Sequence, residues 1–204
     1  EQRRLTDNLN YDGNPTWSPD GRRIFFISDR DGSPGLCVMN VDGSEQIRLT
    51  KAIYHVNTAA WSPDGERLAF SSPRPEIVGA YVRDEIYVMN TDGSEATPLT
   101  YGPATTDSQP VWSPDGKRII FSSKRDGNFE IYVMNVDGSG QTRLTHNLFP
   151  DFDPTWSSDG KFIAFASKHD DNTAIYVMNA DGSNSVRLTA PPFDAHSPAW
   201  SPVP

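Results

Sequence analysis

Residues 110–145 decide the fold, and they read PVWSPDGKRIIFSSKRDGNFEIYVMNVDGSGQTRLT. Short apolar runs alternate in this stretch with turn-forming residues. Pro114-Asp115-Gly116 follows the first run, and Asp137-Gly138 follows the third. Proline presets φ, glycine supplies a positive φ, and Asp-Gly between apolar runs is a strong hairpin signal. The stretch therefore predicts four short antiparallel strands joined by tight turns.

The same pattern recurs along the whole chain. The tryptophans stand at positions 17, 61, 112, 156 and 200, at spacings of 44, 51, 44 and 44 residues. Four-stranded meanders that repeat every 40–50 residues or so are typical of β-propellers, and no segment shows helical periodicity with caps. We therefore predict an all-β fold, a β-propeller of four-stranded antiparallel blades in a single domain, 1–204. The predicted blades cover residues 14–50, 58–100, 109–145 and 153–189.

The two ends of the chain carry partial repeats. Residues 1–6 align with the last strand of a blade, and residues 196–201 align with a first strand. The sequence thus predicts four complete repeats plus the first and last strands of a fifth position. Three arrangements stay open: four blades closing with extra end strands, five positions closing with one thin blade, or part of a larger ring. Unpaired end strands would also allow self-association.

Composition and charge exclude several classes of protein. With 36% apolar and 11% aromatic residues, the chain has the material for a folded core. Its net charge of −9 argues against a nucleic-acid partner. No run approaches 18 apolar residues, so we expect no membrane span, and no signal-peptide pattern opens the chain. A single cysteine, Cys37, rules out an intrachain disulfide.

The repeat resembles that of a known family. Trp112-Ser-Pro-Asp-Gly116, Ile119-Ile-Phe121, Ile131-Tyr-Val-Met134 and Leu144-Thr145 resemble the repeats of the TolB family over nearly the whole chain. That resemblance implies a periplasmic or extracellular propeller that binds partner proteins, among them a peptidoglycan-associated lipoprotein. The chain departs from the family's six blades and separate N-terminal domain in showing four full repeats. Similar repeats occur in tricorn-type proteases and prolyl-oligopeptidase-like enzymes.

Polar residues cluster in the loops that enter the first strands. In a propeller these loops lie beside the innermost strand, so we expect them to ring the mouth of the central channel. A ring of carboxylates there would attract a cation or a basic peptide. The alternative is that these side chains only cap turns. The candidate binding residues are Asp12, Asn57, Asp107, Asp151, Asp153, Asp194, His55 and His196.

An insertion between the second and third strands of the second repeat, residues 72–84, is the one strongly asymmetric feature. Long loops on rigid scaffolds often carry binding sites. Arg74, Tyr81 and Arg83 belong to residue types that are enriched at interface hot spots. They are the second set of candidates, and the alternative is a neutral surface loop.

The sequence offers no catalytic machinery. It has no Gly-x-Ser-x-Gly elbow, its Asp-x-Asp-Gly segments lack the remaining calcium ligands, and its histidines lack the spacing of metal ligands. We therefore predict no catalytic residue, no metal site and no cofactor, apart from a channel cation that the acidic loops would suit. Cys37, the four methionines and the five tryptophans are expected to pack in the core.

Three functions remain open. The leading hypothesis is a non-enzymatic scaffold that binds a protein or peptide at the channel mouth or through the 72–84 insertion. The second is the propeller part of a prolyl-oligopeptidase-like or tricorn-like hydrolase. The third is a metal-dependent propeller similar to the sugar-acid lyases, with His55, His196 and Asp194 as ligands.

Overall fold

The computed structural model describes residues 2–51, 56–74, 83–102, 106–169, 172–190 and 194–201. This part of the chain forms sixteen strands and no helix. The strands make four antiparallel sheets of four strands each, and within each sheet the strands follow one another in sequence order. The predicted all-β fold with four-stranded blades is confirmed.

The four blades have nearly equal strand lengths. The first consists of β1 (Asp12–Trp17), β2 (Arg23–Ser28), β3 (Gly35–Asn40) and β4 (Ile47–Arg48). The second consists of β5 (Thr58–Trp61), β6 (Arg67–Pro73), β7 (Asp84–Asn90) and β8 (Thr97–Pro98). The third consists of β9 (Asp107–Trp112), β10 (Arg118–Ser123), β11 (Glu130–Asn135) and β12 (Thr142–Arg143). The fourth consists of β13 (Asp151–Trp156), β14 (Phe162–His169), β15 (Asn172–Asn179) and β16 (Val186–Arg187).

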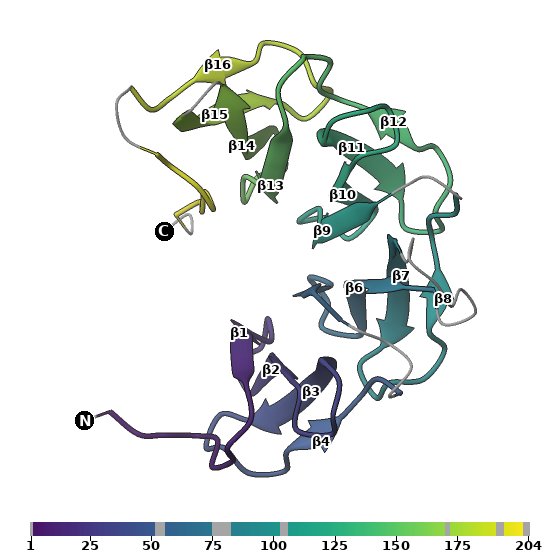
Figure 1. Ribbon diagram of the computed structural model, residues 1–204, viewed down its shortest axis with the longest axis vertical. Coiled ribbons are helices and arrows are strands. Elements are labelled where there is room, and N and C mark those ends of the chain that lie inside the picture. Colours follow the sequence, from purple (N-terminus) through teal and green to yellow (C-terminus); the bar gives the residue numbers. More distant parts are fainter. Residues whose placement is uncertain are drawn as a thin grey trace.

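The blades stand in an open arc around a central space (Figure 1). The first strand of a blade faces the centre and the fourth lies at the rim, where Pro98 occupies the edge strand β8. The two end segments lie apart on the open side of the arc. Residues 2–6 and 196–201 therefore have no strand to pair with and form none, unlike the predicted end strands.

The first turn of each blade depends on a serine–aspartate pair. In the first blade the Ser18 hydroxyl donates to Asp20 Oδ1 (2.6 Å), and the Gly21 N–H donates to the Ser18 carbonyl (2.9 Å). In the fourth blade Ser157 and Asp159 form the same bond (2.7 Å), although the intervening residue is a serine and not a proline. Hydrogen bonds from Ser157 and from Lys161 lower the pKa of Asp159 to about 2. Proline is therefore dispensable in this turn.

The second turn places a glycine where two blades touch. Gly93 has a φ of +85°, and a Cβ there would lie 2.5 Å from the Leu49 carbonyl oxygen of the preceding blade. A side chain would be strained by its φ and blocked by this backbone atom. The Asn-x-Asp-Gly turn thus serves the hairpin and the contact between blades.

The hydrophobic core lies between successive blades. Three clusters of buried side chains join the first blade to the second, the second to the third and the third to the fourth. Trp61, Trp112 and Trp156 belong to these clusters, at exposures of 8%, 5% and 5%. The guanidinium of Arg67 in the second blade lies 4.9 Å from the ring centroid of Trp112 in the third.

Other predicted core residues also pack as expected, with one exception. Cys37 is buried, and burial raises the pKa of its thiol. The four methionines are buried as well. Trp200 lies against Phe162, with ring centroids 6.4 Å apart. Trp17 differs: it belongs to none of the three clusters between the described blades, and its exposure is 60%.

Candidate functional site

The inner strands share a bulge immediately before a proline. In β1, β9 and β13 the bulge falls at Asn14, Gln109 and Asp153, with φ values of +50°, +56° and +52°. Ser197, at the same repeat position, has a φ of +49°. The second blade has Thr58 there and keeps a regular ladder. A bulge bends the inner strand and re-aims the side chain that it carries.

These positions are linked from blade to blade by hydrogen bonds. The Gln109 N–H donates to Thr58 Oγ1 (3.1 Å), and the Asp153 N–H donates to Gln109 Oε1 (3.0 Å). The Ser197 N–H donates to Asp153 Oδ2 (3.2 Å), while Gln109 Nε2 donates to Asp153 Oδ1. We call these four residues the inner ladder. It connects neighbouring blades at the centre of the arc.

The inner ladder borders a central cavity of about 540 Å³. First strands from all four blades contribute to its lining, together with Ser197 and Pro198. Apolar groups such as Trp17, Ala59 and Val111 alternate there with the hydroxyl, amide and carboxylate groups of the inner ladder. A mixed lining of this kind can hold an extended peptide, with apolar contacts for affinity and polar groups for orientation.

The acidic residues predicted at the channel mouth occupy two different places. Asp153 borders the central cavity. Asp12, Asp107 and Asp151 do not, because each begins an inner strand and turns its carboxylate into the blade. Their carboxylates are largely or wholly buried there. These three residues therefore do not form the predicted ring of carboxylates around the channel mouth.

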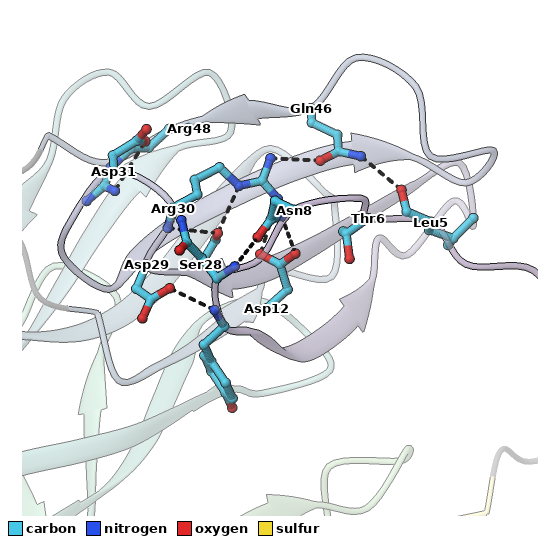
Figure 2. Close-up of polar contacts among 12 residues, drawn as sticks. Leu5, Thr6, Asn8, Asp12, Ser28, Asp29, Arg30, Asp31, Gln46 and Arg48 are labelled. Carbon is cyan, nitrogen blue, oxygen red and sulfur yellow. Dashed lines mark hydrogen bonds and ion pairs between the residues drawn. The ribbon is translucent and has the colours of Figure 1, made fainter.

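An arginine explains the burial of Asp12. Arg30 donates to Asp12 Oδ1 (3.2 Å), to Ser28 Oγ (2.9 Å) and to Gln46 Oε1 (2.7 Å), as Figure 2 shows. Asn8 donates to the other oxygen of Asp12 (2.7 Å). Burial alone would raise the pKa of Asp12, but hydrogen bonding from Ser28, Asn8, Thr6 and Arg30 outweighs this effect and lowers the pKa. The residues form a structural ion-pair cluster that ties the inner strand to the rim of the blade.

The third blade repeats this cluster, and the fourth keeps only half of it. Arg125 pairs with Asp107 (3.1 Å), as Arg30 pairs with Asp12. Asp151 receives a hydrogen bond from Asn147 (2.7 Å), but position 169, which corresponds to Arg125, is a histidine. Burial raises the pKa of Asp151 above its ordinary value.

The remaining mouth candidates are dispersed. Asn57 donates to Asp84 (2.7 Å), and its carbonyl accepts from Asn14 beside the cavity (3.4 Å). Asp194 accepts the N–H of Thr173 (2.7 Å) and so closes a loop. His196 is exposed. His55 lies outside the described residues. Within the described ranges, no three His, Cys, Asp or Glu side chains are placed to hold a metal ion.

The insertion offers an anchored arginine. Arg74 Nε lies 2.7 Å from Glu85 Oε2, and its guanidinium lies 5.1 Å from the ring centroid of Tyr101. Arg83 is partly buried. Tyr81 lies outside the described residues.

Sequence reasoning missed most of the inner ladder. Thr58, Gln109 and Ser197 were not candidates, nor was Asn14. A signal was present, because each repeat has a polar residue three positions before its tryptophan, followed in four of five cases by proline.

Comparison with known proteins gives a consistent picture. The family model described as the TolB beta propeller domain matches residues 1–79 and 49–204. The Tol-Pal system protein TolB of Bordetella pertussis is 39% identical over 114 residues, which are 55% of this chain and 24% of that protein. An uncharacterized peptidase of Bacillus subtilis, YuxL, is 28% identical over 106 residues, 52% of this chain and 8% of that protein. The chain thus spans a quarter or less of these relatives.

Solved structures share the fold across functional classes. TolB from Acinetobacter baumannii has a TM-score of 0.75 at 23% identity, over 94% of this chain and 47% of that one. A puromycin-hydrolyzing peptidase of Mycobacterium tuberculosis also has a TM-score of 0.75, at 15% identity. This match covers 94% of this chain and 33% of that one. An oligogalacturonate lyase in complex with manganese has a TM-score of 0.72 at 16% identity, and the match covers 94% of this chain and 57% of that one. At these identities the likeness concerns the fold alone.

Proposed function

Because this chain belongs to the TolB beta propeller domain family, we propose that it is a non-enzymatic scaffold that binds a protein or peptide in its central cavity. The observation that carries the proposal is the cavity of about 540 Å³, which the inner strands of all four blades line with mixed polar and apolar groups. The inner ladder fixes this lining, so the site is preformed and binding need not order it.

The insertion is a second contact site in this proposal. Arg74 is held in place by Glu85 and lies over Tyr101 at the edge of the second blade. An arginine that is already oriented loses little side-chain freedom when a partner docks on it. A protein that fills the cavity would gain further contacts on this loop.

Peptide selection with a blocked cavity tests the proposal. Random peptides displayed on phage are selected on the folded chain and then measured against two variants. Thr16→Trp fills the cavity from an exposed position of β1, and Thr142→Trp adds the same bulk at the exposed rim strand β12. We expect Thr16→Trp to lower the affinity at least tenfold and Thr142→Trp to leave it unchanged. Peptides that bind both variants equally, or no enrichment at all, would refute cavity binding.

A second candidate is the propeller part of a peptidase. The similarity to YuxL and the fold of the puromycin-hydrolyzing peptidase favour it, since this chain would cover only a minor part of such proteins. The test is the complete reading frame: a Gly-x-Ser-x-Gly segment in a hydrolase domain would support it. A lyase-like role needs a metal, and metal analysis of the purified protein tests that role directly.

The proposed location is the periplasm, as the resemblance to the TolB family implies. The described residues include no helix long and apolar enough to cross a membrane. Fractionation of cells that express the complete gene tests the location. Recovery with a cytoplasmic marker enzyme would contradict it.

A further inference from the structure

The arginine of the third blade occupies a slot with four kinds of contact. Arg125 Nε donates to Ser123 Oγ (2.8 Å), and Nη2 donates to Asp107 Oδ2 (3.1 Å). Nη1 donates to Gln141 Oε1 (2.6 Å). The guanidinium lies 5.4 Å and 4.6 Å from the ring centroids of Phe121 and Tyr132. The slot therefore offers an aromatic wall, a hydroxyl, an amide and a buried carboxylate.

The fourth blade keeps this slot and lacks its arginine. The counterparts 44 residues later are Ser167, Asp151, Phe165 and Tyr176. Three of these, with His169 and Ser185, line a pocket of about 390 Å³. Ser185 stands where the third blade has Gln141, so the pocket is also wider at its rim. We call it the blade-4 slot.

His169 does not replace the missing arginine. β14 continues to His169, whereas β10 ends at Ser123, two residues before Arg125. The His169 ring is therefore held in a strand, where Nε2 and the Tyr176 hydroxyl lie 3.2 Å apart. The same ring lies against Phe149, with centroids 4.1 Å apart, and is stacked on Tyr176, with centroids 5.5 Å apart. His169 thus takes over part of the aromatic contact of the missing arginine but none of its contact with the carboxylate. It does not bind the carboxylate of Asp151.

Two buried polar atoms beneath the blade-4 slot are left without a partner. Asp151 Oδ1 and Ser167 Oγ make no hydrogen bond in the described part of the chain, and the two residues are 0% and 1% exposed. In the first blade Arg30 donates to Asp12 Oδ1. In the third blade Arg125 donates to Asp107 Oδ2, although Asp107 Oδ1 also has no partner there among the described residues. The fourth blade therefore differs in having, within the described ranges, no cation on either carboxylate oxygen. Burial raises the pKa of Asp151 above its ordinary value. A buried carboxylate oxygen without a partner is costly and favours binding of a cation.

The other blades do not combine a buried aspartate at this position with the absence of the arginine. The second blade has Val56 in place of the aspartate, and its Arg74 pairs with Glu85 instead. The first and third blades have both members of the pair. Among the described blades, only the fourth has the carboxylate without the arginine.

We propose that the blade-4 slot binds an arginine side chain of a protein or peptide partner. Its guanidinium would stack on Phe165 and Tyr176 and donate to Ser167 Oγ and Asp151 Oδ1. A lysine fits less well, because its compact and strongly hydrated ammonium neither stacks on rings nor binds two acceptors in one plane. The proposal rests on the protein-binding role proposed above, but it concerns a separate site.

Short peptides test the proposal on the intact chain. Acetyl-Gly-Arg-Gly-amide, its lysine analogue and its neutral citrulline analogue are titrated into ¹⁵N-labelled protein and followed by NMR. We expect saturable shifts confined to β13, β14 and β15 with the arginine peptide. Lysine should bind at least fivefold more weakly and citrulline at least tenfold. Shifts that do not saturate, that are spread over all blades, or that are equal for the three peptides would overturn the proposal.

Two variants sharpen this test. Asp151→Asn removes the charge beneath the slot and should weaken arginine binding at least tenfold. The double variant His169→Arg/Ser185→Gln rebuilds the third blade's arginine slot and should abolish binding without lowering the melting temperature. Thr142→Arg adds the same charge at the exposed rim and serves as the control with unchanged binding. Arginine binding that survives in Asp151→Asn would overturn the proposal.

The proposal for the central cavity and the proposal for the blade-4 slot can be refuted independently. Thr16→Trp blocks the central cavity and should leave the arginine shifts intact, since none of the slot residues lines that cavity. Loss of the arginine shifts with retained cavity peptides would refute the blade-4 slot alone. The opposite pattern would refute cavity binding alone.

Discussion

The same substitution in two neighbouring blades should have opposite effects on stability. Asp107 and Asp151 begin equivalent inner strands, and both are fully buried. Asp107 is paired with Arg125, whereas Asp151 accepts a hydrogen bond from the amide of Asn147 and has no cationic partner among the described residues. We predict that Asp107→Asn destabilises the protein and that Asp151→Asn does not.

The magnitudes follow from what each substitution leaves behind. Removing one partner of a buried ion pair costs about 3–5 kcal/mol. The Arg125 side chain keeps 22% exposure and regains some hydration, so we expect about 3 kcal/mol for Asp107→Asn at pH 7. Asp151→Asn removes a charge without a cationic partner and keeps an acceptor for Asn147. Its effect should lie within about 1 kcal/mol of zero, on the stabilising side.

The pH dependence gives a second signature. The folded-state pKa of Asp151 is raised above its ordinary 3.8. Its contribution therefore favours folding below pH 3.8 and is lost as the pH rises through the folded-state pKa. The advantage of Asp151→Asn should accordingly be absent at pH 3.5 and grow as the pH rises through the folded-state pKa of Asp151. Each pKa unit by which the two states differ corresponds to about 1.4 kcal/mol.

Urea denaturation followed by circular dichroism measures both effects. The wild type and the two variants are unfolded between pH 3.5 and pH 8, and the midpoints are compared where the slopes agree. The matched positions control for the general cost of substitution in an inner strand. Equal losses in both variants at neutral pH, or a larger loss in Asp151→Asn, would refute the reasoning.

Three further predictions concern packing and turns. Trp112→Ala should lower the free energy of unfolding, measured in urea, by about 3–5 kcal/mol. Trp17 is 60% exposed, so Trp17→Ala should lower it by less than half of that amount. Equal losses in the two variants would contradict the assigned packing. Gly93→Ala should lower the melting temperature clearly more than Gly32→Ala. Both glycines have a positive φ, but only at Gly93 would the added Cβ collide with a backbone oxygen of the preceding blade. Equal decreases in melting temperature would refute this contact. Asp159→Asn should flatten the acid side of the stability curve, since the lowered pKa of about 2 gives stability that is present above pH 3.8 and lost as the pH falls towards 2; an unchanged melting temperature profile from pH 2 to 5 would contradict this.

The predicted channel candidates show where local reasoning stops. Asp12, Asp107, Asp151 and Asp153 were predicted as one group because all four lie where the chain enters a first strand. The structure separates them, since β13 pairs regularly at the buried Asp151 and bulges at Asp153, which borders the cavity. A shift of one residue in a strand exchanges its two faces. Only the bulge decides which aspartate faces the centre, and no single-repeat pattern reveals it.

The four blades follow from short-range signals in the sequence. Their turns close through bonds between residues two to five positions apart, such as Ser18 with Asp20 and Ser18 with Arg23. Such bonds depend only on neighbouring residue types, so four repeats of one pattern fold into four like hairpin pairs. The buried second and third strands follow from their apolar composition in the same way.

The sites, in contrast, depend on contacts between residues that are far apart in the sequence. The inner ladder joins residues 44 to 51 positions apart, and the Asp107–Arg125 pair spans 18 positions and two strands. These contacts exist because the core between the blades sets the angle and distance at which successive sheets meet. The blade-4 slot emerges only when equivalent side chains are compared in space, because a histidine at position 169 leaves the carboxylate of Asp151 buried without the arginine that the repeat otherwise supplies.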